Sequence, residues 1–355
     1  MPAQARHTET MLVDWDLARS TATRLIKPGP TVSRTHARES VTDLLAAAKA
    51  AETHVVRYTG LIPVEPIPAV VVVDRPTWAL SLLGSMEHTM EPLLAKLIAG
   101  KGPSGLTGKA GRTVTGLQVG TAVAWMASRV LGQYDPLRPD GEERLLLVAP
   151  NVVHVERALD VLPADFRMWV ALHEQTHRLQ FCAVPWMRSY FTSLIEEFGS
   201  TARLDPADLG ARLGAAASAL TSAVRGHAGP PLIEVLQGPE ARATLDKLVA
   251  FMSLLEGHAD QVMDAIGPEV VPSVGVIRER FEQRRGHAGI IDRVIKSVMG
   301  MDAKLAQYRD GGHFVRTVVD TVGVEGFSAV WESPLNLPTR EEIAEPKAWM
   351  SRVLV

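Results

Sequence analysis

Apolar residues recur at the three- and four-residue spacing of α-helices along most of this chain. Over the first half, this spacing predicts helices within 14–51, with a break near the prolines of 27–30, and further helices at 78–98 and 117–131. A final helix is predicted to begin at Thr339, because Thr339 and Glu342 match a capping box. The helices predicted over the second half are 152–160, 164–184, 186–200, 207–225, 239–266, 274–299 and 301–323.

Only two segments have the pattern of β-strands. Residues 70–73 are a run of valines that follows a proline cluster, and 144–149 is a mostly apolar run that follows a turn. The predicted fold class is therefore mainly α, of the α+β type, with at most a small β-sheet. We divide the chain into a mostly helical N-terminal lobe, 1–143, and a second region, 144–355, and expect the two to pack as one compact unit.

Composition and charge restrict the class of protein. The 355 residues are 46% hydrophobic and 22% charged, which is ordinary for a globular protein with a large core. The formal net charge of −3 lacks the excess of Lys and Arg that a nucleic-acid partner would favour. Cys182 is the single cysteine, so we expect neither an internal disulfide nor a CxxC metal site. No apolar stretch reaches the roughly 20 residues of a membrane span, and the polar start lacks the apolar segment of a signal peptide, so we expect a cytoplasmic protein.

The strongest chemical signal is the HExxH sequence His173-Glu174-Gln175-Thr176-His177. Two histidines four residues apart lie on one face of a helix, where both imidazoles can bind one metal ion. Glu174 lies beside His173, at an angle suited to a water at the metal rather than to the metal itself. This arrangement is typical of zinc hydrolases, in which zinc lowers the pKa of water and polarises a carbonyl while the glutamate acts as general base.

A catalytic zinc site needs a third protein ligand, and the segment 254–260 offers candidates. Glu256 and Asp260 are four residues apart on a predicted helix and therefore share a face. We predict that Glu256 is the third ligand and that Asp260 accepts a hydrogen bond from a zinc-bound histidine, His173 in this assignment. His258 points to another side of the helix and stays the alternative ligand, or a residue that faces the substrate.

A zinc hydrolase also needs a hydrogen-bond donor for the oxyanion that forms at the attacked carbonyl. The C-terminal third offers Tyr308, Arg309, His287 and His313. Tyr308 is the first choice, because a phenol can donate a hydrogen bond to an oxyanion. The alternative, a tyrosine packed between helices, stays open.

HExxH followed by ExxxD resembles the gluzincin branch of zinc peptidases. The chain resembles more closely a family of uncharacterised zincin-like bacterial proteins assigned as hydrolases. The residues that carry this likeness are 169–181, 255–260, 304–315 and 327–338. The resemblance implies a zincin-like helical catalytic core in 144–355, with Zn²⁺ as the cofactor. Some members carry a label of association with deazaflavin cofactor biosynthesis, which names no substrate.

The predicted function is therefore that of a zinc-dependent hydrolase, a peptidase or amidase that acts on a peptide or a small amide. Two alternatives remain. The protein can be a metal-dependent hydrolase that is not a peptidase, acting on a small substrate in cofactor metabolism. It can also be a non-catalytic protein that keeps the zincin fold as a binding scaffold, which a metal site sealed from solvent would favour.

Overall fold

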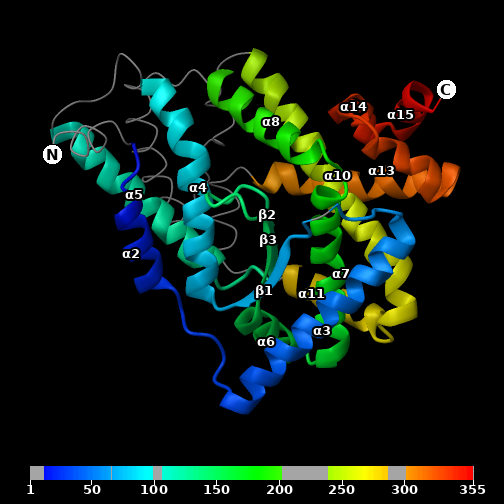
Figure 1. Ribbon diagram of the computed structural model, residues 1–355, viewed down its shortest axis with the longest axis horizontal. Coiled ribbons are helices and arrows are strands. Elements are labelled where there is room, and N and C mark those ends of the chain that lie inside the picture. The colour runs from blue at the N-terminus through cyan, green and yellow to red at the C-terminus, as the bar shows by residue number, and fades with distance from the viewer. Residues whose placement is uncertain (1–11, 65, 99–105, 202–238, 287–300, 355) are drawn as a thin grey trace.

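The computed structural model describes residues 12–64, 66–98, 106–201, 239–286 and 301–354 (Figure 1). The protein is mainly helical with one small β-sheet, which confirms the predicted fold class. The helices are α2 (Trp15–Leu25), α3 (Arg34–Thr59), α4 (Arg75–Ile98), α5 (Leu106–Met126), α6 (Ala149–Ala158), α7 (Pro163–Cys182), α8 (Met187–Thr201), α10 (Pro239–Val270), α11 (Val274–Gly286), α13 (Met301–Phe327), α14 (Arg340–Ala344) and α15 (Pro346–Val353). The strands are β1 (Ala69–Val73), β2 (Gly132–Asp135) and β3 (Arg144–Val148).

The helix ends follow the local signals in the sequence. α2 ends before the proline cluster at 27–30, as predicted. α3 ends at Gly60, whose φ of 72° is a left-handed conformation that glycine adopts without strain. The capping box at the start of α14 is also present: the Thr339 side chain accepts from the Glu342 backbone, and the Glu342 side chain accepts from the Thr339 backbone. The predicted helix at 207–225, and residues 287–299 of the one at 274–299, lie outside the described residues.

The sheet has the strand order β1–β3–β2, with β3 parallel to β1 and antiparallel to β2. Successive side chains of β3 enter different hydrophobic cores. Leu147 belongs to the larger core, with residues of α3, α7, α10 and α13, whereas Leu146 and Val148 belong to a smaller core with α2, α4 and α5. Figure 1 shows these two groups of helices on opposite sides of the sheet. Because both faces are covered, this strand appears in the sequence as a continuous apolar run.

The prediction of a helix at 117–131 was wrong at its C-terminal end. α5 begins earlier, at Leu106, and ends at Met126, and the chain then turns into β2, which was not predicted. The buried Asn151 side chain donates hydrogen bonds to the carbonyl oxygens of Ala127 and Val130, at 2.9 and 2.6 Å. These bonds satisfy backbone groups at the end of the helix and stabilise the turn, so a residue more than 20 positions away decides where the helix stops.

Strand β2 is held against α4 by two side chains from one of its faces. Gln133 accepts a hydrogen bond from the Trp78 indole at 2.9 Å, and Asp135 accepts one from Ser85 at 2.7 Å. The other face of β2, which carries Gly132 and Tyr134, is turned toward α7. The strand therefore lies between α4 and α7 and contacts both.

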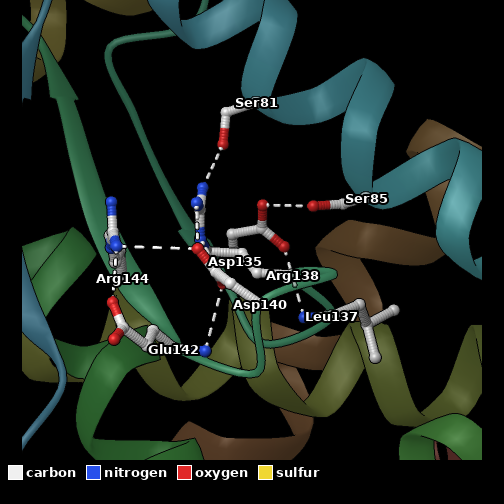
Figure 2. Close-up of polar contacts among 8 residues, drawn as sticks. All are labelled: Ser81, Ser85, Asp135, Leu137, Arg138, Asp140, Glu142 and Arg144. Carbon is white, nitrogen blue, oxygen red and sulfur yellow. Dashed lines mark hydrogen bonds and ion pairs between the residues drawn. The ribbon is translucent and has the colours of Figure 1, made fainter.

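The connection between β2 and β3 is stabilised by a polar network that reaches α4 (Figure 2). Arg138 donates to Ser81 of α4 at 2.7 Å and forms an ion pair with Asp140, also at 2.7 Å. Asp140 in turn accepts from the backbone of Glu142, and Arg144 at the start of β3 pairs with the Glu142 side chain at 2.6 Å. This short loop is thus stabilised by bonds within it and by a bond to the neighbouring helix α4.

Helices α10 and α13 cross with their backbones in contact. A methyl group at Gly257 of α10 would collide with the backbone of Gly311, and one at Gly311 of α13 would collide with the carbonyl of Ser253. The crossing point adjoins Glu256, so the two glycines determine how closely α13 approaches the segment that carries the predicted third ligand.

The proposed division at residue 143 stays a prediction. The sheet contains strands from both sides of this position, since β1 and β2 precede it and β3 follows it. Within the described ranges, no helix combines the length and the apolar character that a membrane span requires.

We expect Gly311→Ala to lower the free energy of unfolding by about 1 to 3 kcal/mol, because the added methyl group must push the two helix backbones apart. The control is Gly84→Ala in α4, where a methyl group would meet no atom within 4 Å. That substitution should raise the free energy of unfolding by about 0.5 to 1 kcal/mol, since alanine is the better helix former. Chemical denaturation measures both values, and equal effects would refute the close crossing.

Candidate metal centre

The HExxH sequence lies in the middle of α7, which is buried on most of its surface. Pro163 occupies the first turn, where its missing N–H costs nothing, and the apolar residues that follow pack into the larger core. Arg167 anchors the helix through a buried two-point ion pair with Glu156 of α6, at 2.8 and 3.0 Å, and through Asp43 of α3 at 2.6 Å. The helix that carries the candidate ligands is therefore held firmly before any metal binds.

The structure brings His173 and His177 together with Glu256 of α10. The two imidazole Nε2 atoms are 3.1 Å apart. One Glu256 oxygen lies 3.7 Å from Nε2 of His173, and the other lies 3.7 Å from Nε2 of His177. All three side chains thus direct a ligand atom to one point between α7 and α10.

These distances fit a single small cation. A tetrahedral zinc ion with bonds of about 2.1 Å would place neighbouring ligand atoms about 3.4 Å apart. The two imidazole nitrogens are 3.1 Å apart, and each lies 3.7 Å from its nearer Glu256 oxygen, so both distances are close to that value. Two imidazole nitrogens and one carboxylate oxygen are also a donor set that zinc prefers in catalytic sites. The residues present therefore fit Zn²⁺ without rearrangement of the two helices.

Solvent reaches the three candidate ligands. The side chains of His173 and His177 are 25% and 15% exposed, and that of Glu256 is 38% exposed. Structural zinc sites are normally closed by four protein ligands, whereas catalytic sites keep a position open for water or substrate. Three ligands with an accessible side match the catalytic type.

Glu174 lies between the metal site and strand β2. Its carboxyl group rests against Gly132, where a methyl group would come within 2.6 Å of the carboxyl carbon. The side chain is almost fully buried, and this burial, with a smaller contribution from the charge of Glu256, raises the pKa of Glu174 to about 8. Gly132 was missed in the sequence, because nothing local shows that position 132 faces a residue 42 positions later.

Gln180 connects the two ligand-bearing helices. Its side-chain oxygen lies 3.0 Å from Nδ1 of His177, and its side-chain nitrogen lies 3.0 Å from both the Leu255 carbonyl oxygen and Nδ1 of His258. The residue is completely buried. Sequence reasoning missed it too, although its position three residues after His177 places it on the same helix face.

His258 is buried, with 3% of the residue exposed. Its ring stacks on Phe327 at a centroid distance of 5.4 Å and is tilted against Trp331 at 5.1 Å. Burial lowers the pKa of His258 to about 3, with a smaller contribution from His177. Its Nδ1 faces Gln180, so the structure groups Glu256 rather than His258 with the two histidines.

The remaining predicted site residues lie farther along α10 and α13. Asp260 is exposed, and one of its carboxylate oxygens approaches Gly312 of α13, so its role as acceptor for His173 stays a prediction. Tyr308 belongs to α13, but its side chain lies outside the described part of the structure, as does His287, and the oxyanion role of Tyr308 likewise stays a prediction. His313 is exposed.

Arg178, the residue after the second histidine, points away from the metal site. Its guanidinium donates to the Pro68 carbonyl at 2.7 Å and to Gln175 at 3.1 Å, and it pairs with Glu52 of α3 at 2.8 Å. This charge is therefore used to join α7 to α3 and places no cation beside the candidate ligands.

A buried HExxH helix whose two imidazoles meet a glutamate from a second helix has the arrangement of residues that a zincin-type metal centre requires. The sequence model of the zincin-like metallopeptidase family matches residues 13–350, and the chain belongs to this family. The match confirms the resemblance predicted from the sequence and extends it over nearly the whole chain. Members of such a family use a metal ion, typically zinc.

One solved structure resembles this chain over almost its full length. It is described as "a putative hydrolase with a novel fold" from Chloroflexus aurantiacus, with 31% sequence identity and a TM-score of 0.71. The alignment covers 96% of this chain and 98% of the other. Among curated proteins, no sequence matches this chain.

The raised pKa of Glu174 predicts how pH changes the stability of the metal-free protein. The pKa of Glu174 is about 8 in the folded protein and 4.5 in the unfolded chain. As the pH rises between these values, the unfolded chain releases its proton first, and the free energy of unfolding therefore falls. Glu174→Gln removes this cost, which is on the order of a few kcal/mol. In the presence of a chelator, the variant should match the wild type near pH 4.5 and exceed its free energy of unfolding at pH 8.5.

The control for the loss of one negative charge is Glu269→Gln, since Glu269 lies on the surface of α10 in an exposed ion pair with Arg57. Its stability relative to wild type should change little across the same pH range. A Glu174→Gln difference that is independent of pH would contradict the assigned pKa.

Proposed function

We propose that this protein is a zinc-dependent hydrolase of amide bonds, in which His173, His177 and Glu256 hold Zn²⁺ and Glu174 is the general base. The observation that carries the proposal is the convergence of three side chains at a point that solvent reaches. The two imidazole Nε2 atoms are 3.1 Å apart, and each lies 3.7 Å from one of the two Glu256 oxygens. Membership of the zincin-like metallopeptidase family supports the same chemistry.

Zinc, when bound, supplies the Lewis acidity that makes water acidic and polarises the carbonyl group of the substrate. As the general base, Glu174 would take the proton of the attacking water on a carboxylate oxygen and pass it to the leaving nitrogen. Its burial against Gly132 excludes competing water from one side of the carboxyl group. The positive charge of a bound cation would lower the pKa of Glu174 below its metal-free value, which favours the basic form at neutral pH.

Two features help to choose among the alternatives. The exposed ligands disfavour a non-catalytic scaffold, for which a sealed site would be expected. Within the described chain, β2 pairs on one side only, and an edge strand can offer backbone hydrogen bonds to an extended chain. Since β2 also contacts Glu174 through Gly132, this arrangement favours a peptide over a compact small amide.

Metal analysis of the purified protein should find about one zinc ion per chain. Glu256→Ala should lose most of this zinc, because two histidines alone bind the ion too weakly to retain it through dialysis. Glu269→Ala, which removes an exposed carboxylate from the same helix, should keep it. Full retention of zinc in Glu256→Ala would rule out this residue as the third ligand.

Glu174→Gln should keep zinc but lose hydrolytic activity by about 100- to 10,000-fold, because the amide cannot accept the proton of the attacking water. Activity is measured on a library of fluorogenic peptides and on a set of small N-acyl amides, which separates a peptidase from a hydrolase of small substrates. Glu269→Gln is the matched control and should retain the activity of the wild type. A fully active Glu174→Gln protein would overturn the assigned base.

A further inference from the structure

We propose that Gln180 is a positioning residue that sets the tautomer of His177 and thereby aims the Nε2 lone pair of this histidine at the metal position. The tautomer follows from the hydrogen bonds alone. Its consequence for metal affinity rests on the proposed zinc function.

The orientation of the Gln180 amide is determined by a backbone carbonyl. One end of the side chain lies 3.0 Å from the carbonyl oxygen of Leu255, which can only accept a hydrogen bond. This end must therefore be the NH₂ group, and the opposite end must be the oxygen. The assignment needs no assumption about either histidine.

The opposite end faces His177. Because the amide oxygen can only accept, Nδ1 of His177, 3.0 Å away, must carry the proton and donate it. A neutral imidazole with its proton on Nδ1 has a lone pair on Nε2. This Nε2 is the atom that lies 3.1 Å from His173 and 3.7 Å from Glu256, at the proposed metal position.

The second hydrogen of the Gln180 NH₂ group points to His258. Nδ1 of this ring lies 3.0 Å from the amide nitrogen and must accept, since the nitrogen can only donate. Stacking on Phe327 and a tilted contact with Trp331 hold the ring in this orientation. His258 therefore serves as a buried acceptor that completes the bonding of Gln180.

Both N–H groups of the Gln180 amide and its oxygen have hydrogen-bond partners. The oxygen accepts once and the NH₂ group donates twice, in a position without solvent access. The buried amide therefore has one stable orientation, because exchanging its oxygen and nitrogen would place the oxygen against the Leu255 carbonyl oxygen. Leu255 precedes Glu256, so the same side chain also fixes α7 against the segment that supplies the third candidate ligand.

Metal-free wild-type protein should show this tautomer directly. Nitrogen-15 NMR of the imidazole side chains at pH 8.5 should find the His177 proton on Nδ1, and a proton on Nε2 would overturn the proposal. Gln180→Glu provides a second test, because its carboxylate still accepts from Nδ1 but cannot donate to Leu255. It should keep the Nδ1 proton while the free energy of unfolding falls.

Gln180→Leu removes the acceptor and should weaken zinc affinity by about 10- to 100-fold, the usual effect of losing a partner behind a metal-bound histidine. Affinity is measured by competition with a chromophoric chelator. The control is Gln175→Leu, which removes an equally buried glutamine from the same helix. Gln175 bonds to the Ala48 carbonyl at 2.9 Å and to Arg178, on the side that faces α3.

The control variant should lose stability without a change in zinc affinity or in the tautomer of His177. Equal zinc affinity in Gln180→Leu and the wild type would refute the positioning role. A wild-type protein that binds no zinc would refute the proposed metal function instead, and NMR of the metal-free protein would still decide whether Gln180 sets the tautomer.

Discussion

The contact between α7 and α10 is the interaction on which the candidate site depends. Neither helix can form the ligand set alone, because His173 and His177 belong to one and Glu256 to the other. Apolar burial brings the helices together, since Leu254 and Leu255 pack in the same core as Leu172 and Leu179. Apolar contacts are non-directional, so they do not by themselves fix how each helix is rotated about its axis or how far it is shifted along its partner. The fully bonded Gln180 and the close α10–α13 crossing supply that geometric precision.

α7 is a buried helix that carries an unusual number of polar side chains. Burial makes each of them costly unless it has a partner. Arg167, Gln175 and Arg178 use theirs to join α7 to α3 and α6, on the sides away from the metal position. The side toward α10 carries the two candidate ligands and Gln180, and Glu174 faces β2. The residues that join α7 to α3 and α6 therefore lie on different sides of the helix from the residues that face the candidate metal position.

The three-stranded sheet contributes to both the hydrophobic cores and the candidate site. It divides the two hydrophobic cores, and its edge strand β2 forms the wall against which Glu174 is buried. Gly132 makes this possible, because any larger residue would occupy the space of the carboxyl group. The strand is itself held by Trp78 and Ser85 of α4, so the environment of Glu174 is connected through β2 to the smaller core.

The sequence by itself determined the mainly helical class, the β1 and β3 strands, the capping box at Thr339 and the placement of both histidines on one helix face. These features depend on spacings of two to four residues, which the local backbone geometry converts directly into position. Only the tertiary structure decided that the chain forms β2 after Met126, that Gly132 touches Glu174, and that Gln180 rather than a carboxylate faces Nδ1 of His177. The first two depend on contacts across more than 20 residues, and the third depends on the bond from Gln180 to the Leu255 carbonyl, 75 positions later, which orients the amide. In each case the packing of whole helices, rather than periodicity, determines which side chains meet.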